Sequence, residues 1–370
     1  MGRRTSMFAA SLLIALAAAG LGASPAQAAT GHVIVVSGSI QAAVDAARPG
    51  DTIVVPPGTY DGGVVVNTSG ITIRGSRAAV IDAAGHRYGI QVGTGAIGVG
   101  PNGNPVCPPL ALHGITIDGL TIQHAEDTGV RLIGVDGFRL THGRYVDNEE
   151  YGPFPVCSAN GLIDFNDVSG TDDAGIYVGD DTRVTVANNH VSGCAIGIEV
   201  ENSLHSVVRD NKTVGNTTGI LVSLLPGLPM PVNDDTLIED NVVDHNNLPN
   251  PVPFNSGDDV GLLPTGTGIL NVGGDHVVIR RNAVVGNDSV GVAIIRSPFG
   301  PLDPRLEVNP DGNQVVANTI LRNGLSPDPV RATTPGADIV YDGTGVGTCF
   351  GRNVFATDFP AGITALFPCP

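Results

Sequence analysis

The sequence predicts an all-β protein, a right-handed parallel β-helix of about ten or more stacked coils, and three observations lead to this fold class. The segment from Phe165 to Val222 contains three copies of one repeat, whose equivalent glycines Gly175, Gly197 and Gly219 are 22 residues apart. Apolar residues alternate in short runs without helical periodicity, which indicates strands and turns. Asparagine recurs at one position of the repeat, at Asn166, Asn189, Asn211, Asn241, Asn282 and Asn318.

A second column of asparagines follows the first by five residues. Asparagine tolerates left-handed backbone, and its amide can bond to the copy one coil away, so stacked columns of it suit the corners of a coil. Parallel strands joined by right-handed crossovers complete the predicted coil. The second column contains Asn148, Asn216, Asn246, Asn287 and Asn323.

On these repeats the chain resembles the pectin-lyase-like superfamily, and within it the bacterial proteins with parallel β-helix repeats. The resemblance covers roughly residues 31–325. It implies the fold but no single activity, because that superfamily contains lyases, hydrolases, esterases, epimerases and phage tailspikes.

Residues 1–28 have the pattern of an export signal. Arg3 and Arg4 precede an apolar run from Met7 to Leu21, and Ala26-Gln27-Ala28 is a small-x-small cleavage site. We therefore expect cleavage near Ala28 and a secreted, extracellular protein. The apolar run is short for a membrane span, so stable membrane insertion is not expected.

Residues 29–66 are predicted to form an N-terminal cap and the first strands. Ile40 to Ala47 has helical apolar spacing, with Ser39 at the N-cap position and Pro49-Gly50 beyond its end. An amphipathic helix there would cover the open end of the solenoid. The segment also resembles the N-terminal cap of many carbohydrate-active β-helix proteins. We expect the coils over residues 67–325 and a C-terminal cap over 326–370.

Four segments rich in Pro, Gly and Asn interrupt the coils. Three of them follow a Gly-x-x-Val strand directly, so they leave the coil at one corner and could together wall a groove. The alternative is tolerated drift in a repeat protein. The insertions are residues 93–112, 224–235, 248–265 and 296–312.

The five cysteines of an exported chain suggest two disulfides and one free thiol. Cys349 with Cys369 would pin the C-terminal cap, and Cys107 with Cys157 would tie the first insertion to a coil. Cys194 falls in an inward-facing asparagine column, where we expect a buried free thiol rather than a nucleophile.

The charge balance disfavours nucleic acid as a partner. Lys and Arg number 19 against 36 Asp and Glu, and removal of residues 1–28 leaves 17 against 36, a formal charge of −19. A polyanionic glycan would need a cation or a local basic patch to approach such a surface. The same charge also serves solubility alone. No phosphate-binding glycine loop or Cys-x-x-Cys motif is present, so no organic cofactor is expected, and we expect a monomer.

The residue between the two aliphatics of Gly-Ile-x-Val should point away from the coil interior, toward solvent. This outward row contains a cation, two aromatic rings and a carboxylate in its middle. Phe154, Glu199 and Gln91 are the candidate substrate-binding residues, on which a sugar chain could stack and hydrogen-bond, although an ordinary exposed strand is the alternative. The full row is Gln91, Arg131, Phe154, Tyr177, Glu199, Leu221, Leu270 and Ala293.

Six carboxylates recur just before the repeated glycine in three consecutive coils. Like charges so placed raise one another's pKa or recruit a cation, and oxygen ligands of this kind suit Ca²⁺. A solvated acidic corner is the alternative interpretation. The predicted metal ligands are Glu126, Asp127, Glu149, Glu150, Asp172 and Asp173.

Three functional classes follow. In a calcium-assisted lyase or C5-epimerase acting on uronic-acid polymers, the cation would stabilise an enolate and a nearby group would move the proton. The second class is a glycoside hydrolase with a carboxylate pair, and the third is a non-catalytic protein that binds a polysaccharide, a cell-wall glycan or another partner. No catalytic motif of the superfamily is matched. The candidate proton-handling residues are Arg131, Tyr177, His124 and His142.

Overall fold

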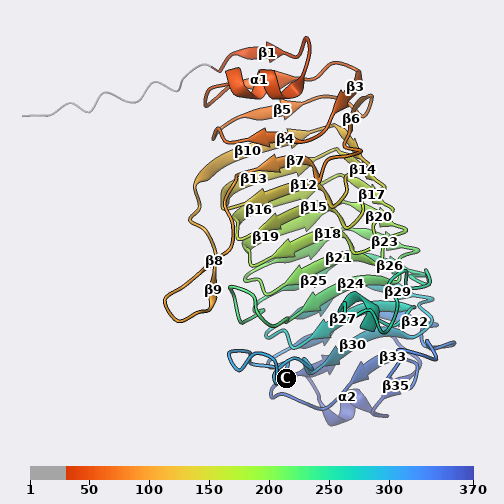
Figure 1. Ribbon diagram of the computed structural model, residues 1–370. Coiled ribbons are helices and arrows are strands. Elements are labelled where there is room, and N and C mark those ends of the chain that lie inside the picture. The colour runs from red at the N-terminus through yellow and green to blue at the C-terminus, as the bar shows by residue number, and fades with distance from the viewer. Residues whose placement is uncertain (1–30) are drawn as a thin grey trace, which may run out of the picture. The chain divides into compact units, whose positions relative to one another are not determined.

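The computed structural model describes residues 31–370, so the predicted export signal of residues 1–28 lies outside the described residues. Three parallel sheets run the length of a solenoid and are closed by corners between them (Figure 1). The repeat length of 22 or 23 residues therefore corresponds to one coil, with one strand in each sheet. The fold class predicted from the sequence is confirmed as all-β.

Sheet A has twelve strands, sheet B ten and sheet C eleven. In stacking order, sheet A contains β1 (Val33–Val35), β2 (Thr52–Val54), β5 (Thr72–Arg74), β10 (Leu112–Asp118), β13 (Val135–Thr141), β16 (Ala159–Asp164), β19 (Thr182–Ala187), β22 (Val207–Arg209), β25 (Leu237–Glu239), β28 (Val278–Arg280), β31 (Gln314–Val316) and β34 (Cys349–Gly351). Sheet B contains β3 (Gly58–Asp61), β6 (Ala79–Asp82), β11 (Thr121–Gln123), β14 (Arg144–Val146), β17 (Asp167–Ser169), β20 (His190–Ser192), β23 (Lys212–Val214), β26 (Val242–Asp244), β29 (Ala283–Val285) and β32 (Thr319–Leu321). Sheet C contains β4 (Val64–Val66), β7 (Tyr88–Val92), β12 (Thr128–Ile133), β15 (Tyr151–Val156), β18 (Ala174–Gly179), β21 (Ile196–Glu201), β24 (Thr218–Ser223), β27 (Thr267–Val272), β30 (Val290–Ile295), β33 (Ala337–Tyr341) and β35 (Asp358–Phe359).

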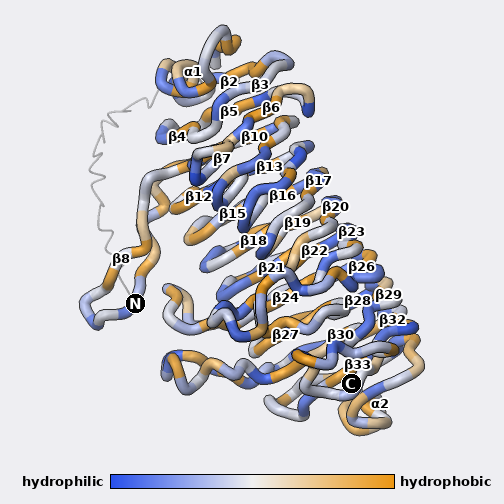
Figure 2. Tube along the Cα trace, turned by 45° about the vertical axis from the view of Figure 1, so that its right-hand side comes forward, coloured by the Kyte–Doolittle hydropathy of each residue, from blue (hydrophilic) through white to orange (hydrophobic). Residues whose placement is uncertain are grey.

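Little of the described chain is helical. Helix α1 (Ile40–Ala46) begins at Ser39, whose side chain accepts a hydrogen bond from the backbone N of Ala42, and it buries Ile40, Ala43 and Val44. The other helical elements are the short 3₁₀ helix η1 (Val260–Leu262) and α2 (Ile363–Leu366). Among residues 31–370, no helix has the length and apolar character needed to cross a membrane. A small antiparallel hairpin, β8 (Gly98–Val99) and β9 (Pro105–Val106), projects from the stack in the first insertion (Figures 1 and 2).

The core is a set of aliphatic columns that run along the axis of the solenoid. Hydropathy alternates along the strands (Figure 2), because successive side chains point to opposite faces of a sheet. One column of sheet C pairs residue to residue through five consecutive coils and is fully buried. It consists of Ile176, Ile198, Ile220, Ile269 and Val292.

The first asparagine column forms a buried ladder. The side-chain oxygen of Asn282, for example, accepts from both the backbone N and Nδ2 of Asn241, at 2.9 and 3.0 Å. Nδ2 of Asn241 also donates to the carbonyl oxygen of Val208 at 2.9 Å. The second column repeats this arrangement from Asn216 through Asn323 and ends on Asp338. Each asparagine therefore satisfies backbone groups at a corner that no strand partner reaches.

Both predicted disulfides are present, Cys107–Cys157 and Cys349–Cys369. The first ties the projecting insertion to the end of β15, and the second links β34 to the last residues of the chain. Cys194 is a buried free cysteine in the second asparagine column, as predicted, and its backbone N donates to the side-chain oxygen of Asn216.

Candidate active site

The outward row predicted on sheet C is in register, but its middle is not exposed to solvent. Glu199 pairs with Tyr177 on one side and with Leu221 on the other, as the repeat predicted. The solvent-exposed fractions are nevertheless small, at 5% for Tyr177 and 4% for both Glu199 and Leu221. The expectation of a solvent-facing row was therefore wrong here, because insertions fold back over this face of the sheet and bury it.

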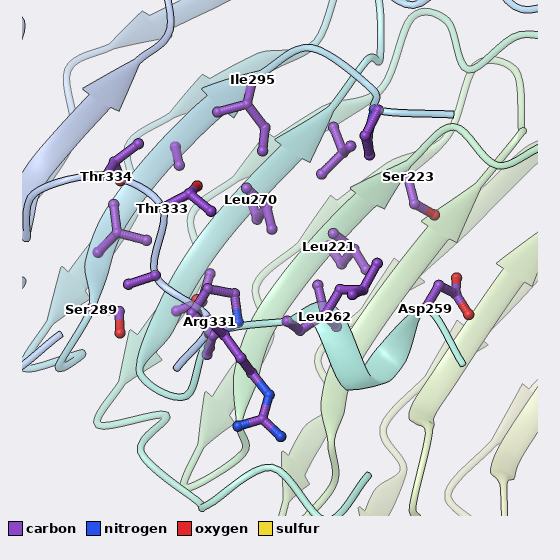
Figure 3. A pocket seen from close by; sticks show the side chains of 18 of the residues that line it. Leu221, Ser223, Asp259, Leu262, Leu270, Ser289, Ile295, Arg331, Thr333 and Thr334 are labelled. Atoms are coloured by element: carbon purple, nitrogen blue, oxygen red, sulfur yellow. Dashed lines mark hydrogen bonds between the residues drawn. The ribbon is translucent and has the colours of Figure 1, made fainter. Parts of the chain in front are cut away.

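These insertions enclose a groove of about 540 Å³ over β21, β24, β27, β30 and β33. In Figure 3, Leu221 and Leu270 lie between Leu262 and Arg331 on one side and Ile295 on the other. The first wall combines residues 254–264 with 330–334, and the second includes residues 296, 298 and 299. Arg331 holds the first wall together, since its guanidinium donates to the carbonyl oxygens of Gly261 and Val252 at 2.9 and 3.0 Å.

The predicted role of the insertions is thus correct for some of them. Residues 248–265 and 296–312 contribute to the walls, and Leu225 is the contribution of residues 224–235. The first insertion, residues 93–112, does not line the groove among the described residues. It leaves sheet C several coils earlier, after β7, so its position along the axis separates it from the groove.

A cluster of carboxyl groups lies at one end of the groove, where Figure 3 shows Ser223 and Asp259. Glu199 borders the groove, and its Oε1 accepts a hydrogen bond from the hydroxyl of Ser223 at 2.9 Å. Glu201, two residues further along β21, accepts from the hydroxyl of Tyr177 at 3.0 Å. Asp173, one coil earlier, accepts from the hydroxyl of Tyr151 at 2.6 Å. We call Asp173, Glu199, Glu201 and Asp259 the acid cluster.

Burial and mutual repulsion favour the protonated forms within the acid cluster. Burial raises the pKa of Glu199 well above its usual value, and the charges of Glu201 and Asp173 raise it further. The pKa of Glu201 is raised in the same way, by burial and by the charge of Asp259. Burial raises the pKa of Asp173 to about 7. At neutral pH the cluster therefore holds at least one proton among several carboxyl groups.

No positive charge offsets this arrangement within the described residues. The ion pairs of residues 31–370 do not include Asp173, Glu199 or Glu201, and the groups that shift their pKa values contain no cation. Oδ1 of Asp173 is buried without a hydrogen-bond partner. Burying carboxyl groups without an ion-pair partner lowers the stability of the folded state, and groups of this kind are characteristic of functional sites.

Aromatic rings support the acid cluster on its N-terminal side. The rings of Phe154 and Tyr177 stack with centroids 4.3 Å apart, and Tyr151 packs against Phe154 at 4.5 Å and against Tyr177 at 5.3 Å. Phe154 is only partly buried and borders the cluster that contains Ile133 and Cys157. The predicted sugar-stacking residue therefore lies next to the acid cluster, on the side opposite the groove's apolar floor.

The six predicted metal ligands are not gathered into one site. Glu126, Glu149, Glu150 and Asp172 are exposed, and Asp127 binds Arg87 through an ion pair of 2.7 Å. Asp173 alone belongs to the acid cluster, where the charge of Glu150 contributes to its raised pKa. Over residues 31–370, no group of three or more His, Cys, Asp or Glu side chains has the arrangement of a metal site. Calcium binding stays a prediction.

The predicted proton-handling residues lie apart from one another. His124 contacts Asp82 at 3.1 Å beyond the end of β11, and His142 contacts Asp118 at 3.1 Å between sheets A and B. The guanidinium of Arg131 lies 5.5 Å from the ring centroid of Tyr88. Only Tyr177 reaches the acid cluster, and there its hydroxyl donates to Glu201.

Gln91, the third predicted substrate-binding residue, lies at the N-terminal end of the outward row. Its Nε2 donates to the carbonyl oxygen of Gly93 at 3.0 Å, at the point where the first insertion begins. The register places Arg131 and then Phe154 beside it on the following strands. Gln91 is therefore separated from Glu199 by three intervening strands.

Sequence reasoning missed Glu201, Asp259, Tyr151 and Ser223. Glu201 and Ser223 follow the repeated Gly-x-x-Val pattern directly, so their outward direction was available from the period-2 alternation of β21 and β24. Asp259 lies in an insertion without periodicity, and nothing in the sequence places it over Glu199. The Asp258-Asp259 pair in a loop rich in Pro and Gly was its only visible signal.

Fold and groove together define a right-handed parallel β-helix protein with an acidic site on one sheet, and comparisons with known proteins agree. A family model described as a right-handed beta helix region matches residues 62–225. The right-handed parallel β-helix inferred from the repeats is thereby confirmed. No curated protein matches the chain by sequence.

Several solved structures share the fold at low sequence identity. The A-module of a mannuronan C-5 epimerase, AlgE4, from Azotobacter vinelandii has a TM-score of 0.60 at 16% identity, over 86% of this chain and 91% of its own. A DFA-IIIase from Arthrobacter chlorophenolicus has a TM-score of 0.55 at 15% identity, over 84% and 78%. An alginate lyase from Paenibacillus has a TM-score of 0.51 at 15% identity, over 88% and 99%. These similarities establish the fold only.

Proposed function

We propose that the protein is a carbohydrate-active enzyme that cleaves or transfers a glycosidic bond by acid–base catalysis at the acid cluster. The observation that carries this proposal is the cluster itself, in which Glu199 and Asp259 border a groove and no cation among the described residues compensates the carboxyl groups. The named activities of the structural neighbours, on mannuronan and alginate among others, support a glycan as the substrate class.

Two carboxyl groups in different protonation states are what glycosidic cleavage requires. Glu199 is suited to donate a proton to the leaving oxygen, because its raised pKa keeps it protonated and Ser223 fixes its Oε1. Asp259 on the wall is the most exposed carboxyl group of the acid cluster, so it is the member best suited to act as the carboxylate that activates water or attacks the sugar, although burial and the charge of Asp258 raise its pKa as well. Glu201 and Asp173 maintain the negative potential that keeps the proton on Glu199.

A calcium-assisted lyase or C5-epimerase acting on uronic-acid polymers is the second candidate, favoured by the two uronate-acting neighbours. Such a reaction places a substrate carboxylate beside the enzyme's own acid cluster, and a cation or an arginine must then stabilise the enolate. Calcium binding by the predicted ligands stays a prediction, so no step is assigned to the ion. Glycosidic cleavage ranks first because Glu199 and Asp259 both border the groove. Secretion and action outside the cell stay predictions.

The experiment is a product assay on a panel of neutral and uronate glycans, with the wild-type protein and Glu199→Gln. New reducing ends support glycosidic cleavage, and new ultraviolet absorbance from an unsaturated product supports the lyase. Glu307→Gln is the matched control, because Glu307 is an exposed carboxylate outside the groove lining. Binding of a glycan without product in all three proteins would support the non-catalytic alternative.

A further inference from the structure

The floor of the groove is apolar over four consecutive strands beyond the acid cluster. Leu221, Leu270, Ala293 and Val340 occupy one outward row and pair in register through β24, β27, β30 and β33. At the usual separation of about 4.8 Å between strands, this row is about 14 Å long. The row faces out of the coil and is separate from the solenoid's own core. Its side chains pack beneath the walls, where they are only 4%, 6%, 5% and 1% exposed.

The walls add further apolar side chains, several of which remain accessible. Leu262 of η1 and Phe254 line the groove and retain 44% and 40% of their exposure. Pro298 and Phe299 contribute to the opposite wall. Large apolar side chains that stay exposed to solvent at the rim of a preformed groove indicate a binding surface rather than a core.

Polar groups lie at both ends of the groove, and Thr267, Arg296, Arg331 and Asp342 also line it. Of these, Thr267 donates to the carbonyl oxygen of Pro264, Arg331 donates to that of Gly261, and Asp342 accepts from the backbone N of Arg296. In Figure 3, Ser223 and Asp259 lie at one end and Thr333 and Thr334 at the other, with Leu221 and Leu270 between them. Ser289, which also lines the groove, already donates to the carbonyl oxygen of Thr265 and accepts from the backbone N of Asp328. The middle of the groove therefore offers few free partners for hydroxyl groups.

A bare sugar chain is a poor match for this middle section. Each sugar ring carries several hydroxyl groups, and their transfer from water to an apolar surface without replacement hydrogen bonds is unfavourable. A hydrocarbon chain has no such cost, and each buried methylene contributes about 0.8 kcal/mol. The groove thus suits a molecule with a polar head at the acid cluster and an apolar tail along the floor.

We propose that the substrate is an amphiphilic glycoside, in which an alkyl or acyl chain is attached to the sugar. The sugar lies at Glu199 and Asp259, and the chain lies along Leu221, Leu270 and Ala293 toward Val340. This inference rests on the proposed function, because it names the substrate class of the same site.

The test is calorimetric titration of the full-length protein with n-alkyl β-D-glucosides. Their alkyl groups have six to ten carbons, and each glucoside is used below its critical micelle concentration. The inference predicts that affinity rises about three- to fourfold per methylene, with a negative heat-capacity change. Methyl β-D-glucoside measures the contribution of the head group alone. An affinity independent of chain length would overturn the inference.

Ala293→Phe supplies the structural control, because Ala293 lies on the groove floor, where it is 5% exposed, and a ring there occupies the space meant for the alkyl chain. Its Tm is measured beside that of the wild type to show that the variant folds. We expect it to weaken binding of the decyl glucoside at least tenfold and to leave methyl glucoside binding unchanged. Leu325→Gln, at an exposed leucine outside the groove lining, should leave both affinities unchanged. Unchanged decyl glucoside binding by Ala293→Phe would contradict the inference.

The two proposals fail in different ways. Glu199→Gln should lose product formation while keeping the dependence of binding on chain length. If unmodified glycans are cleaved but the affinity for glucosides does not depend on alkyl-chain length, only the amphiphilic substrate is refuted. If the affinity rises with alkyl-chain length but the wild-type protein releases no product from any glycoside, the catalytic proposal is refuted and the binding site is supported.

Discussion

The hydroxyl of Tyr177 donates a 3.0 Å hydrogen bond to Oε1 of Glu201, two positions that lie one coil apart on sheet C. This contact assigns Tyr177 a positioning role, since its hydroxyl points at a carboxyl group of the acid cluster and its pKa is raised well above the usual value by burial. A phenol in this state is a poor base. The sequence predicted that Tyr177 moves a proton, and we infer from this contact that it holds the carboxyl group of Glu201 in place.

Tyr177→Phe tests this role. The substitution removes the hydrogen bond to Glu201 but keeps the ring that stacks on Phe154. Because that bond lowers the pKa of Glu201, we expect the pKa of Glu201 to rise further and the pH profile of kcat to shift. The expected loss of kcat is below about tenfold, which corresponds to about 1.4 kcal/mol. Loss of all activity together with an unchanged pH profile would contradict a positioning role.

The acid cluster should make the protein less stable as the pH rises. The pKa of Asp173 is raised from 3.8 to about 7, so the folded state binds more protons than the unfolded state between these values. Stability is therefore lost as the pH rises through this window. We expect Tm to be lower at about pH 8 than at about pH 5.

Asp173→Asn isolates this effect, because the amide oxygen can still accept from Tyr151 and the side chain cannot ionise. We expect a higher Tm than wild type at about pH 8 and a flatter dependence of Tm on pH. Asp172→Asn, at the exposed neighbouring carboxylate, is the control and should leave the dependence unchanged. The interpretation fails if both variants follow the wild-type curve.

The asparagine ladder should be a main source of stability. Asn241→Ala removes the side-chain partners of Val208 O and of the backbone N of Asn211, and one of the two donors to Asn282 Oδ1, all in a buried corner. Since each buried group left unpaired costs about 1–3 kcal/mol, we expect a loss of about 3–5 kcal/mol in the free energy of unfolding. Lys212→Ala, at the exposed residue that follows Asn211 and pairs with Val242, should change the free energy of unfolding by less than about 0.5 kcal/mol. Denaturant titration measures both, and similar values for the two variants would refute the ladder's contribution.

Arg331 should control the groove wall rather than the solenoid. Arg331→Gln cannot bridge the carbonyl oxygens of Gly261 and Val252, so we expect faster proteolysis within residues 252–261 and a higher KM. The Tm of the solenoid should change little. Arg322→Gln, at an exposed arginine, is the matched control. Equal proteolysis rates in both variants would show that Arg331 does not hold the wall.

The repeat explains why much of the fold could be predicted. A shift of one coil maps each residue onto an equivalent position, so the spacing of Gly175, Gly197 and Gly219 is enough to place Tyr177, Glu199 and Leu221 side by side. The same logic identifies the asparagine columns and the buried Cys194. The two disulfides were also predicted correctly, because few cysteine pairings are compatible with the coils and the C-terminal cap.

The site was harder to predict, because it depends on segments outside the repeat. No periodicity shows that residues 254–264 fold back over sheet C, so the burial of Glu199 and the approach of Asp259 could not be inferred. The predicted carboxylate set stays a prediction for a related reason. The sequence spacing places these carboxylates at one corner of the coils. In the structure Glu126 and Asp172 are exposed to solvent, and Asp127 forms an ion pair with Arg87.

Product release by the wild type and by Glu199→Gln over a panel of glycans and glycosides tests directly whether Glu199 is the proton donor of a glycosidic cleavage. We expect new reducing ends from the wild type, a loss of at least about a hundredfold in kcat for Glu199→Gln, and wild-type rates for Glu307→Gln. Unsaturated product from the wild type, or full activity of Glu199→Gln, would contradict this role of Glu199.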